Sequence, residues 1–195
     1  MPLEIKTFSG IDASHLKNDV ARLRLTVFSE YPYLYDGSEA YEASYLEPLL
    51  SSDSAIIVAV FDRDSVVGVS TGLPLSSESD DILSPWSASE YAPSDIYYLS
   101  ESVLLNPYRG KGIGRVFFSE RLKKARNLGF RYASFCAVVR PDNHPSRPVN
   151  FQPLNGFWKR LGFEMVPGLT CKISWKEHGI SVETPHILQF WIKTL

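Results

Sequence analysis

The stretch VLLNPYRGKGIG, Val103–Gly114, decides the fold of this chain. It joins an apolar run, typical of a buried strand, to a helical pattern that continues to Leu128. Because glycine has no Cβ, backbone N–H groups at 110, 112 and 114 can approach an anion closely. The first turn of the following helix adds unpaired N–H donors and the positive end of the helix dipole. We therefore expect a phosphate site here, with a pyrophosphate as its ligand.

The patterns on both sides of this stretch predict an α/β fold. We expect strands at 3–8, 54–61, 66–73, 96–105, 132–139, 170–175 and 186–193, and helices at 14–28, 38–50, 112–128 and 154–161. The unit at 96–139 reads as a right-handed crossover between two parallel strands. Ligands collect at the carboxyl ends of such strands, which is where the glycine loop would lie. The stretches 74–95 and 140–153 read as irregular insertions.

Composition limits the classes of function. The 195 residues, 44% of them hydrophobic, suit one domain spanning 1–195. A net charge of −2 does not suggest a nucleic-acid partner. The two cysteines and four scattered histidines have no metal-ligand spacing, so we expect no metal site. The chain has no signal sequence and no run long enough to cross a bilayer, so we expect a cytoplasmic protein without membrane contact.

Two motifs resemble those of the GCN5-related N-acetyltransferases (GNAT). Arg109, Gly112 and Gly114 fill the family signature [QR]-x-x-G-x-[GA], and FWKRLGF at 157–163 is similar to the family's FYEKLGF segment. The order of elements is similar over the whole chain, and the match is sharp over 96–139 and 154–165. The resemblance implies a mixed, mostly antiparallel sheet of six or seven strands with about four helices on its faces. Its central parallel pair would splay apart at the cofactor site.

The resemblance also implies acetyl-CoA as the cofactor. The loop N–H groups would hold the pyrophosphate, and the end of strand 96–105 would pair with the pantetheine arm. Leu104 or Leu105 would donate a backbone N–H to the thioester carbonyl and stabilise the oxyanion. We expect Leu105 as that donor and cofactor contacts from Val103, Leu104, Leu105, Arg109, Gly110, Lys111, Gly112, Ile113, Gly114, Arg115, Asn155 and Trp158.

The chain departs from the family pattern at two places. The turn before the signature is one residue shorter, which leaves the register of strand and loop open by one residue. The family tyrosine that often protonates the leaving thiolate is Trp158 here, and an indole N–H is only a hydrogen-bond donor. The proton would come from Tyr132, Cys136 or a water, or no protein acid would be needed.

Glu101 is the candidate general base. A carboxylate inside an apolar strand is unusual, and by strand alternation it faces the same side as Val103 and Leu105. Burial there would raise its pKa toward a value useful for taking a proton from an amine. The alternative is a carboxylate on a solvated face or in a structural hydrogen-bond network.

The acceptor site would be built from loops. Tyr33 and Tyr35, in the link between the first two helices, would line it, and Arg140 and His144 would bind an anionic group of the acceptor. Ordinary packing of the helix pair and solvated loop charges are the alternatives. The acidic run at 78–81 would attract a cationic amine or simply be solvated.

The leading hypothesis is an N-acetyltransferase in which a primary amine of a small molecule or peptide attacks acetyl-CoA directly in a ternary complex. A non-catalytic acyl-CoA-binding sensor is the alternative, and the replacement of the family tyrosine favours it slightly. A Rossmann or P-loop nucleotide site lacks the Lys-Ser/Thr that would follow the glycines. The aromatic strand at 188–192 could join two copies in a homodimer.

Overall fold

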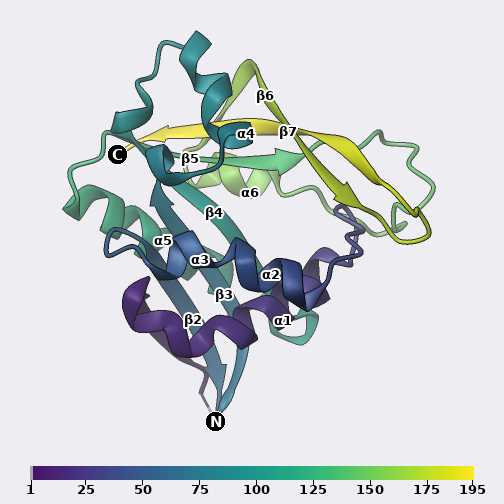
Figure 1. The fold of residues 1–195 in the computed structure, drawn as a ribbon, viewed down its shortest axis with the longest axis horizontal. Helices are drawn as coiled ribbons and strands as arrows, with labels where there is room; N and C mark the ends of the chain where they lie inside the picture. Colours follow the sequence, from purple (N-terminus) through teal and green to yellow (C-terminus); the bar gives the residue numbers. More distant parts are fainter. Residues whose placement is uncertain (1) are drawn as a thin grey trace.

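The structure, a computed structural model, describes residues 2–195, except the side chains of residues 43–45. Its centre is a seven-stranded sheet in the order β1-β2-β3-β4-β5-β7-β6 (Figure 1). The strands are β1 Glu4–Ser9, β2 Ile56–Asp62, β3 Ser65–Pro74, β4 Ile96–Leu104, β5 Tyr132–Val138, β6 Glu164–Lys176 and β7 Glu183–Thr194. Neighbouring strands are antiparallel except for β4 and β5, which are parallel. The predicted mixed sheet is confirmed.

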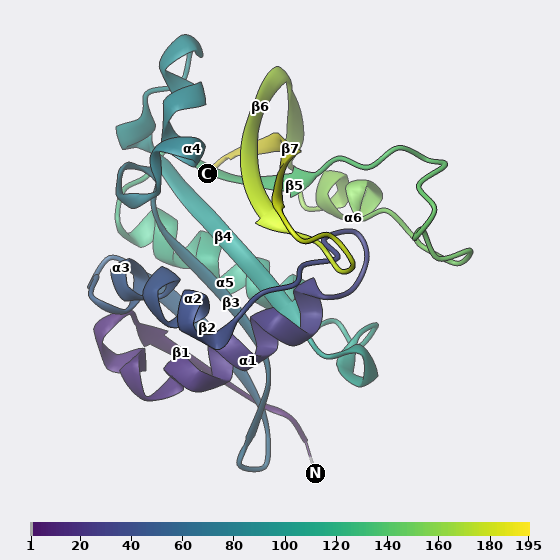
Figure 2. The same cartoon turned by 45° about the vertical axis from the view of Figure 1, so that its right-hand side comes forward.

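Helices cover both faces of this sheet (Figures 1 and 2). One face carries α1 Lys17–Phe28, α2 Glu39–Tyr45, α3 Glu47–Leu50 and α4 Asp80–Leu83, and the other carries α5 Ile113–Asn127 and α6 Asn155–Arg160. Short 3₁₀ turns lie at Ile11–Leu16, Leu75–Ser77, Ser84–Ala88, Pro93–Asp95 and Asn106–Tyr108. Among the described residues, every helix is too short or too polar to cross a membrane.

Local sequence explains where the helices begin and what they bury. Val20 and Leu23 of α1 are fully buried against β2 and β3. The Tyr41 N–H donates to Ser38 Oγ over 3.3 Å, so Ser38 caps α2 as predicted. The longest helix, α5, has a glycine at each end, Gly112 at φ +83° and Gly129 at φ +82°. Both glycines adopt the left-handed backbone that other residues disfavour.

The parallel pair at the centre separates early. Pairing of β4 with β5 runs only from Ile96↔Tyr132 to Tyr98↔Ser134. Beyond Tyr98 the two strands diverge, which Figure 2 shows as an open angle between them. The glycine loop follows the diverging end of β4, so the opening and the loop are neighbours along the chain. The predicted splay is present.

A bulge in β4 lies where the strands separate. Thr71 pairs with Glu101, but Leu73 pairs with Tyr98, so β4 has one residue more than β3 across this interval. The bulge reverses the alternation of side chains. Leu99 packs in the cluster on the α5 face, whereas Val103 packs in the cluster on the α1 face.

The last two strands differ from the prediction. They are longer than expected and form one hairpin from Glu164 to Thr194. Strand β7 lies inside the sheet, between β5 and β6, and its Phe190 and Trp191 are buried. Both hydrogen-bonding edges of this strand are already paired, so it does not offer an edge for pairing with a second copy, and a homodimer stays a prediction.

Candidate active site

The glycine loop has the geometry of an anion cradle. Gly110 (φ +76°) and Gly112 (φ +83°) adopt left-handed backbone, and a Cβ added at either would meet no described atom within 4 Å. At the start of α5, Arg115 donates its N–H to Gly112 O over 3.0 Å. The N–H groups of Ile113 and Gly114 come earlier in the helix, where no carbonyl of the helix can accept from them. The loop therefore fits a phosphate group approaching its open side.

The cations of the loop divide into two kinds. Arg109 is committed to protein partners, since its Nε donates to Leu104 O (2.9 Å) and its Nη1 pairs with Glu30 (2.7 Å). It therefore ties the loop to β4 and to the segment after α1, and its expected cofactor contact stays a prediction. Lys111, over the ring of Tyr108, and Arg115 are exposed at the loop surface.

The ladder of β4 determines which backbone groups face the opening. Leu105 donates its N–H to Val67 O over 3.0 Å, so this N–H belongs to the sheet. The expected oxyanion donor is thus engaged elsewhere. Because donors alternate between the two edges of a strand, Val103 also faces β3, while Ser102 and Leu104 face the opening. Of the two leucines considered, only Leu104 is on the correct edge, and Ser102 joins it.

Glu101 lies at the bulge, on the face that carries α1. Its Oε2 forms an ion pair with Arg24, and Arg24 also pairs with Glu42. All three side chains are buried. Within the described part of the chain, Glu101 Oε1 has no hydrogen-bond partner. The predicted orientation beside Val103 is confirmed, and the pairing with Arg24 joins Glu101 to a buried charge network.

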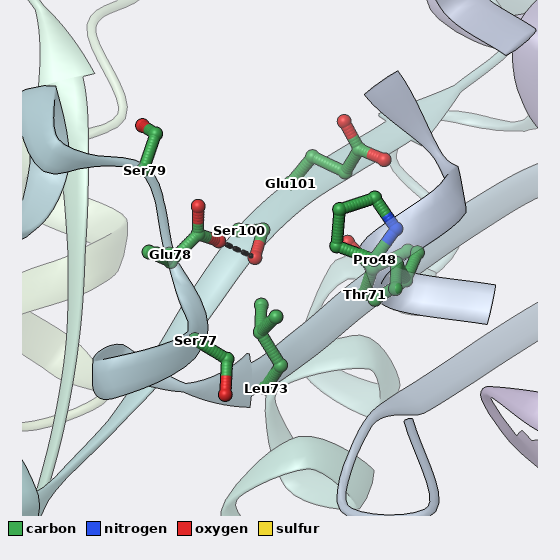
Figure 3. Close-up of a pocket in the computed structure, with 9 residues that line it drawn as sticks. Pro48, Thr71, Leu73, Ser77, Glu78, Ser79, Ser100 and Glu101 are labelled. Carbon is green, nitrogen blue, oxygen red and sulfur yellow. Dashed lines mark hydrogen bonds between the residues drawn. The ribbon is translucent and has the colours of Figure 1, made fainter. Parts of the chain in front are cut away.

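A cavity of about 300 Å³ lies beside this network (Figure 3). Side chains from α3, β3, the turn after β3 and β4 line it: Pro48, Leu49, Thr71, Leu73, Ser77, Glu78, Ser79, Ser100 and Glu101. Ser100 Oγ donates to Glu78 Oε1 over 2.7 Å. Burial raises the pKa of the Glu78 carboxyl above its usual value, although hydrogen bonds from Ser100 and the Ser79 backbone oppose that shift.

Two residues of this site, Glu78 and Arg121, were not among the predicted site residues. Glu78 stood in the acidic run 78–81, and only its burial distinguishes it from the exposed Asp80 and Asp81. Arg121 lies on the apolar side of α5 and is 1% exposed. Its Nη1 donates to Thr71 O (3.1 Å) and Glu101 O (3.0 Å), and its Nη2 donates to Ser102 Oγ (2.8 Å). The sequence signal for Arg121 was a charged residue at an apolar, core-facing position of a helix.

The structure places the expected acceptor residues in a second network. Arg140 donates to Pro32 O (2.7 Å) and Tyr33 O (3.1 Å) and pairs with Glu177. It therefore fastens the link between the first two helices instead of reaching the cavity. Tyr35 donates its hydroxyl to Glu42 Oε1 over 3.0 Å, so it touches the Arg24 network. His144 lies in the loop after β5, beside the ring of Tyr31.

The remaining predicted residues lie on or near the α5 face. Trp158 packs edge-on against Phe135 and Trp191, and Asn155 is exposed at the start of α6. Phe157 meets the open side of Gly114 at 3.5 Å from a built Cβ, so the two motifs pack together.

The candidate thiolate acids differ in position and chemistry. A hydrogen bond with Cys171 and burial raise the pKa of the Cys136 thiol well above its usual value. Tyr132 pairs with Ile96, at the opposite end of β4 from the glycine loop. Whether Tyr132, Cys136 or a water protonates the thiolate, or no protein acid is needed, stays a prediction.

Comparisons with known proteins agree with this geometry. The chain is similar in fold to a ribosomal-protein-alanine N-acetyltransferase from Brucella melitensis (TM-score 0.62, 15% identity, 98% of this chain and 99% of that chain). It is also similar to an N-acetyltransferase from Staphylococcus aureus Mu50 (TM-score 0.60, 14% identity, 100% and 99%). No curated protein matches its sequence significantly. A family model described as the acetyltransferase (GNAT) family matches residues 20–163, and the chain therefore belongs to that family of acetyltransferases.

Proposed function

We propose that the protein transfers the acetyl group of acetyl-CoA to a primary amine of a small molecule or peptide by direct attack in a ternary complex. One observation carries the proposal. Strand β4 leaves β5 beyond Tyr98, and the segment of β4 that follows contributes Ser100 and Glu101 to the cavity and then leads into the glycine loop. A donor bound along the open edge of β4 and an acceptor in the cavity would then meet at the same strand.

Different backbone N–H groups would bind different parts of acetyl-CoA. Acetyl-CoA supplies the activated acetyl group as a thioester. The N–H groups of Ile113 and Gly114 would bind the pyrophosphate, and the Leu104 N–H would pair with the pantetheine arm. The Ser102 N–H would stabilise the oxyanion, because it faces the opening from a backbone that Arg121 fixes in place. The base role of Glu101 stays a prediction.

The test is acetyl transfer itself. Purified protein is incubated with acetyl-CoA and a panel of primary amines, and free thiol and the mass of the acetylated amine are both measured. We expect thiol release that depends on an amine and matches the amide formed. Binding of coenzyme A without thiol release for any amine would overturn the proposal and favour the acyl-CoA sensor.

The loop has a matched control on the same helix. Gly112 and Gly129 have nearly equal φ values, and a Cβ would meet nothing within 4 Å at either. Gly112→Ala and Gly129→Ala should each cost about 1 kcal/mol of stability, because alanine disfavours left-handed backbone. Only Gly112→Ala should weaken coenzyme A binding, by about 10-fold or more in calorimetry. Equal affinities in the two variants would remove the loop from the cofactor site.

A further inference from the structure

The cavity beside Glu101 contains more negative charge than its protein partners balance. Glu78 and Glu101 line it, and Glu101 shares the guanidinium of Arg24 with a third carboxylate, Glu42. Two polar atoms in its lining have no partner among the described residues, Glu101 Oε1 and Thr71 Oγ1, in side chains 7% and 0% exposed. Buried polar groups are usually paired, so these atoms point to a missing ligand.

The walls of the cavity indicate the shape of that ligand. The lining includes three apolar residues, Pro48, Leu49 and Leu73, together with hydroxyl and carboxyl groups. A volume of about 300 Å³ is at the lower end of the range for small-molecule sites. A ligand with an ammonium group and a short apolar body would match both kinds of group.

The bulge in β4 places polar residues of the cavity lining near the proposed position of the acetyl group. Because β4 contains an extra residue here, the consecutive residues Ser100 and Glu101 both line the cavity instead of facing opposite sides of the sheet. Ser102, whose N–H faces the opening, lies two residues further along the strand. At about 3.3 Å per residue, the two serine positions are about 7 Å apart. A ligand nitrogen bound near Ser100 could therefore reach an acetyl group held at Ser102.

We propose that this cavity binds a compact primary ammonium compound with an apolar body, and that Glu78 accepts the proton that the ammonium group must lose before attack. The inference rests on the proposed acetyl transfer and deepens it. Glu101, with one oxygen on Arg24, contributes negative charge that holds the ammonium group.

The Glu78 carboxylate takes one proton from the ammonium group, and the freed lone pair forms the C–N bond to the acetyl carbon. The C–S bond breaks, and the thiolate of coenzyme A takes a second proton from the nitrogen, which leaves a neutral amide. Glu78 is partly exposed, so it returns its proton to water.

The surroundings of Glu78 suit this task better than those of Glu101. Neutral groups, Ser100 Oγ and the Ser79 backbone, provide its hydrogen bonds, and burial is the largest influence on its pKa, which is raised. Arg24 is more distant and lowers that pKa only weakly. The other titratable groups nearby are Tyr98 and Cys136, whose pKa values are both raised well above normal, so both stay protonated.

Turnover variants test the proton acceptor. With phenethylamine as the acceptor, Glu78→Gln should lower kcat/KM by about 100-fold or more and remove the acid limb of its pH profile. Glu90→Gln is the matched control, since Glu90 is exposed and does not line the cavity. Cooperative thermal unfolding with no drop in the midpoint temperature, and unchanged coenzyme A affinity, would show that both variants are folded. A pH profile of Glu78→Gln that keeps its acid limb and its rate would overturn the inference.

Binding tests the cavity independently of turnover. In calorimetry with coenzyme A present, phenethylamine should bind the wild type, and its neutral analogue phenethyl alcohol should bind at least 10-fold more weakly. Glu78→Gln should reduce the preference for the amine to about threefold or less. Equal binding of amine and alcohol to the wild type would overturn the inference even if acetyl transfer is found. Selective binding without any acetyl transfer would instead overturn only the proposed function.

Discussion

Two buried charge clusters lie on the same face of the sheet, at the two ends of one tyrosine. The first is the Arg140 cluster, formed by Arg140, Glu177 and His186, and the second is the Arg24 cluster, formed by Arg24, Glu42 and Glu101. Tyr35 pairs through its backbone with Glu177 and donates its hydroxyl to Glu42. The clusters therefore share a neighbour and a similar composition, but they differ in how fully their members are paired.

The Arg140 cluster is saturated. Each guanidinium nitrogen of Arg140 has a partner. Nε donates to Pro32 O, Nη2 donates to Tyr33 O and to Glu177, and Nη1 contacts His186 Nδ1. In the Arg24 cluster, Glu101 Oε1 has no partner among the described residues, and the residue opens onto the cavity. Leaving a buried polar atom unpaired costs about 1–3 kcal/mol. A saturated cluster fastens chain segments together, whereas the unsaturated one lies beside the cavity for which we propose a ligand.

The largest expected effect comes from removing the shared cation of the Arg24 cluster. Arg24→Met would leave Glu42 and Glu101 buried without a counter-ion, which costs about 3–5 kcal/mol. The midpoint temperature of thermal unfolding should fall by roughly 10 °C. Lys17→Met is the control, because Lys17 and Glu47 form an exposed pair worth at most about 1 kcal/mol. Equal losses of stability in the two variants would show that the Arg24 cluster contributes no more than an exposed ion pair.

Arg140→Met should be the next largest change. It breaks the ion pair with Glu177 and frees two backbone carbonyls, for a loss of about 2–3 kcal/mol. Hydrogen exchange should accelerate at residues 31–36, which Arg140 fastens, while the pH profile of acetyl transfer keeps its shape. A changed profile would mean that the saturated cluster takes part in the chemistry.

Glu101→Gln should separate stability from activity. Arg24 keeps Glu42 as a partner, so the free energy of unfolding should change by less than about 1 kcal/mol. The loss of a buried charge facing the ammonium group should raise the KM for the amine about 10- to 100-fold, equivalent to about 1.4–2.7 kcal/mol. The acid limb should remain, because Glu78 still accepts the proton. Loss of that limb would instead make Glu101 the base.

The smallest effects should appear as opposite slopes of stability with pH. Burial lowers the pKa of His186 below its usual value, so the unfolded chain takes up a proton first as the pH falls from 7 to 5. The free energy of unfolding should therefore fall from pH 7 to pH 5. His186→Gln should make this dependence on pH weaker, as measured by urea unfolding at each pH. A slope unchanged by this substitution would show that His186 is not its source.

Glu78 should show the reverse sign. Its pKa is raised in the folded protein, so the native state keeps its proton longer and loses stability as the pH rises above the usual carboxyl range. Glu78→Gln should therefore unfold at a slightly higher temperature than the wild type at pH 7 and show no gain at pH 4. A loss of stability at pH 7 would give Glu78 a structural role.

Local patterns predicted most of the fold. Apolar periodicity located the strands around Val58 and Val103 and the helix that begins at Ile113, because both faces of the sheet are covered. The glycine loop was also readable, since its turn needs left-handed residues at 110 and 112. The Gly112 and Gly114 positions of the family signature then indicated the cofactor.

The acceptor side could not be predicted in the same way. The donor edge of β4 depends on its register with β3, and one bulge decides whether Leu104 or Leu105 faces the opening. Glu101 lies 77 residues from Arg24, and Pro32, Tyr33 and Glu177 lie 37 to 108 residues from Arg140. Such pairings have no local signature, so Arg140 read as a loop charge and Glu78 as part of a solvated run.

The extra residue in β4 also bears on how relatives of this protein should be compared. Deleting one residue between Tyr98 and Glu101 would restore a regular ladder with β3 and rotate Ser100 or the residues before it to the opposite face. No amino acid would need to be exchanged for the cavity to lose part of its acidic wall. If the cavity binds the acceptor as proposed, the insertion or deletion of a single codon would change acceptor preference, and alignments that score only substitutions would overlook it.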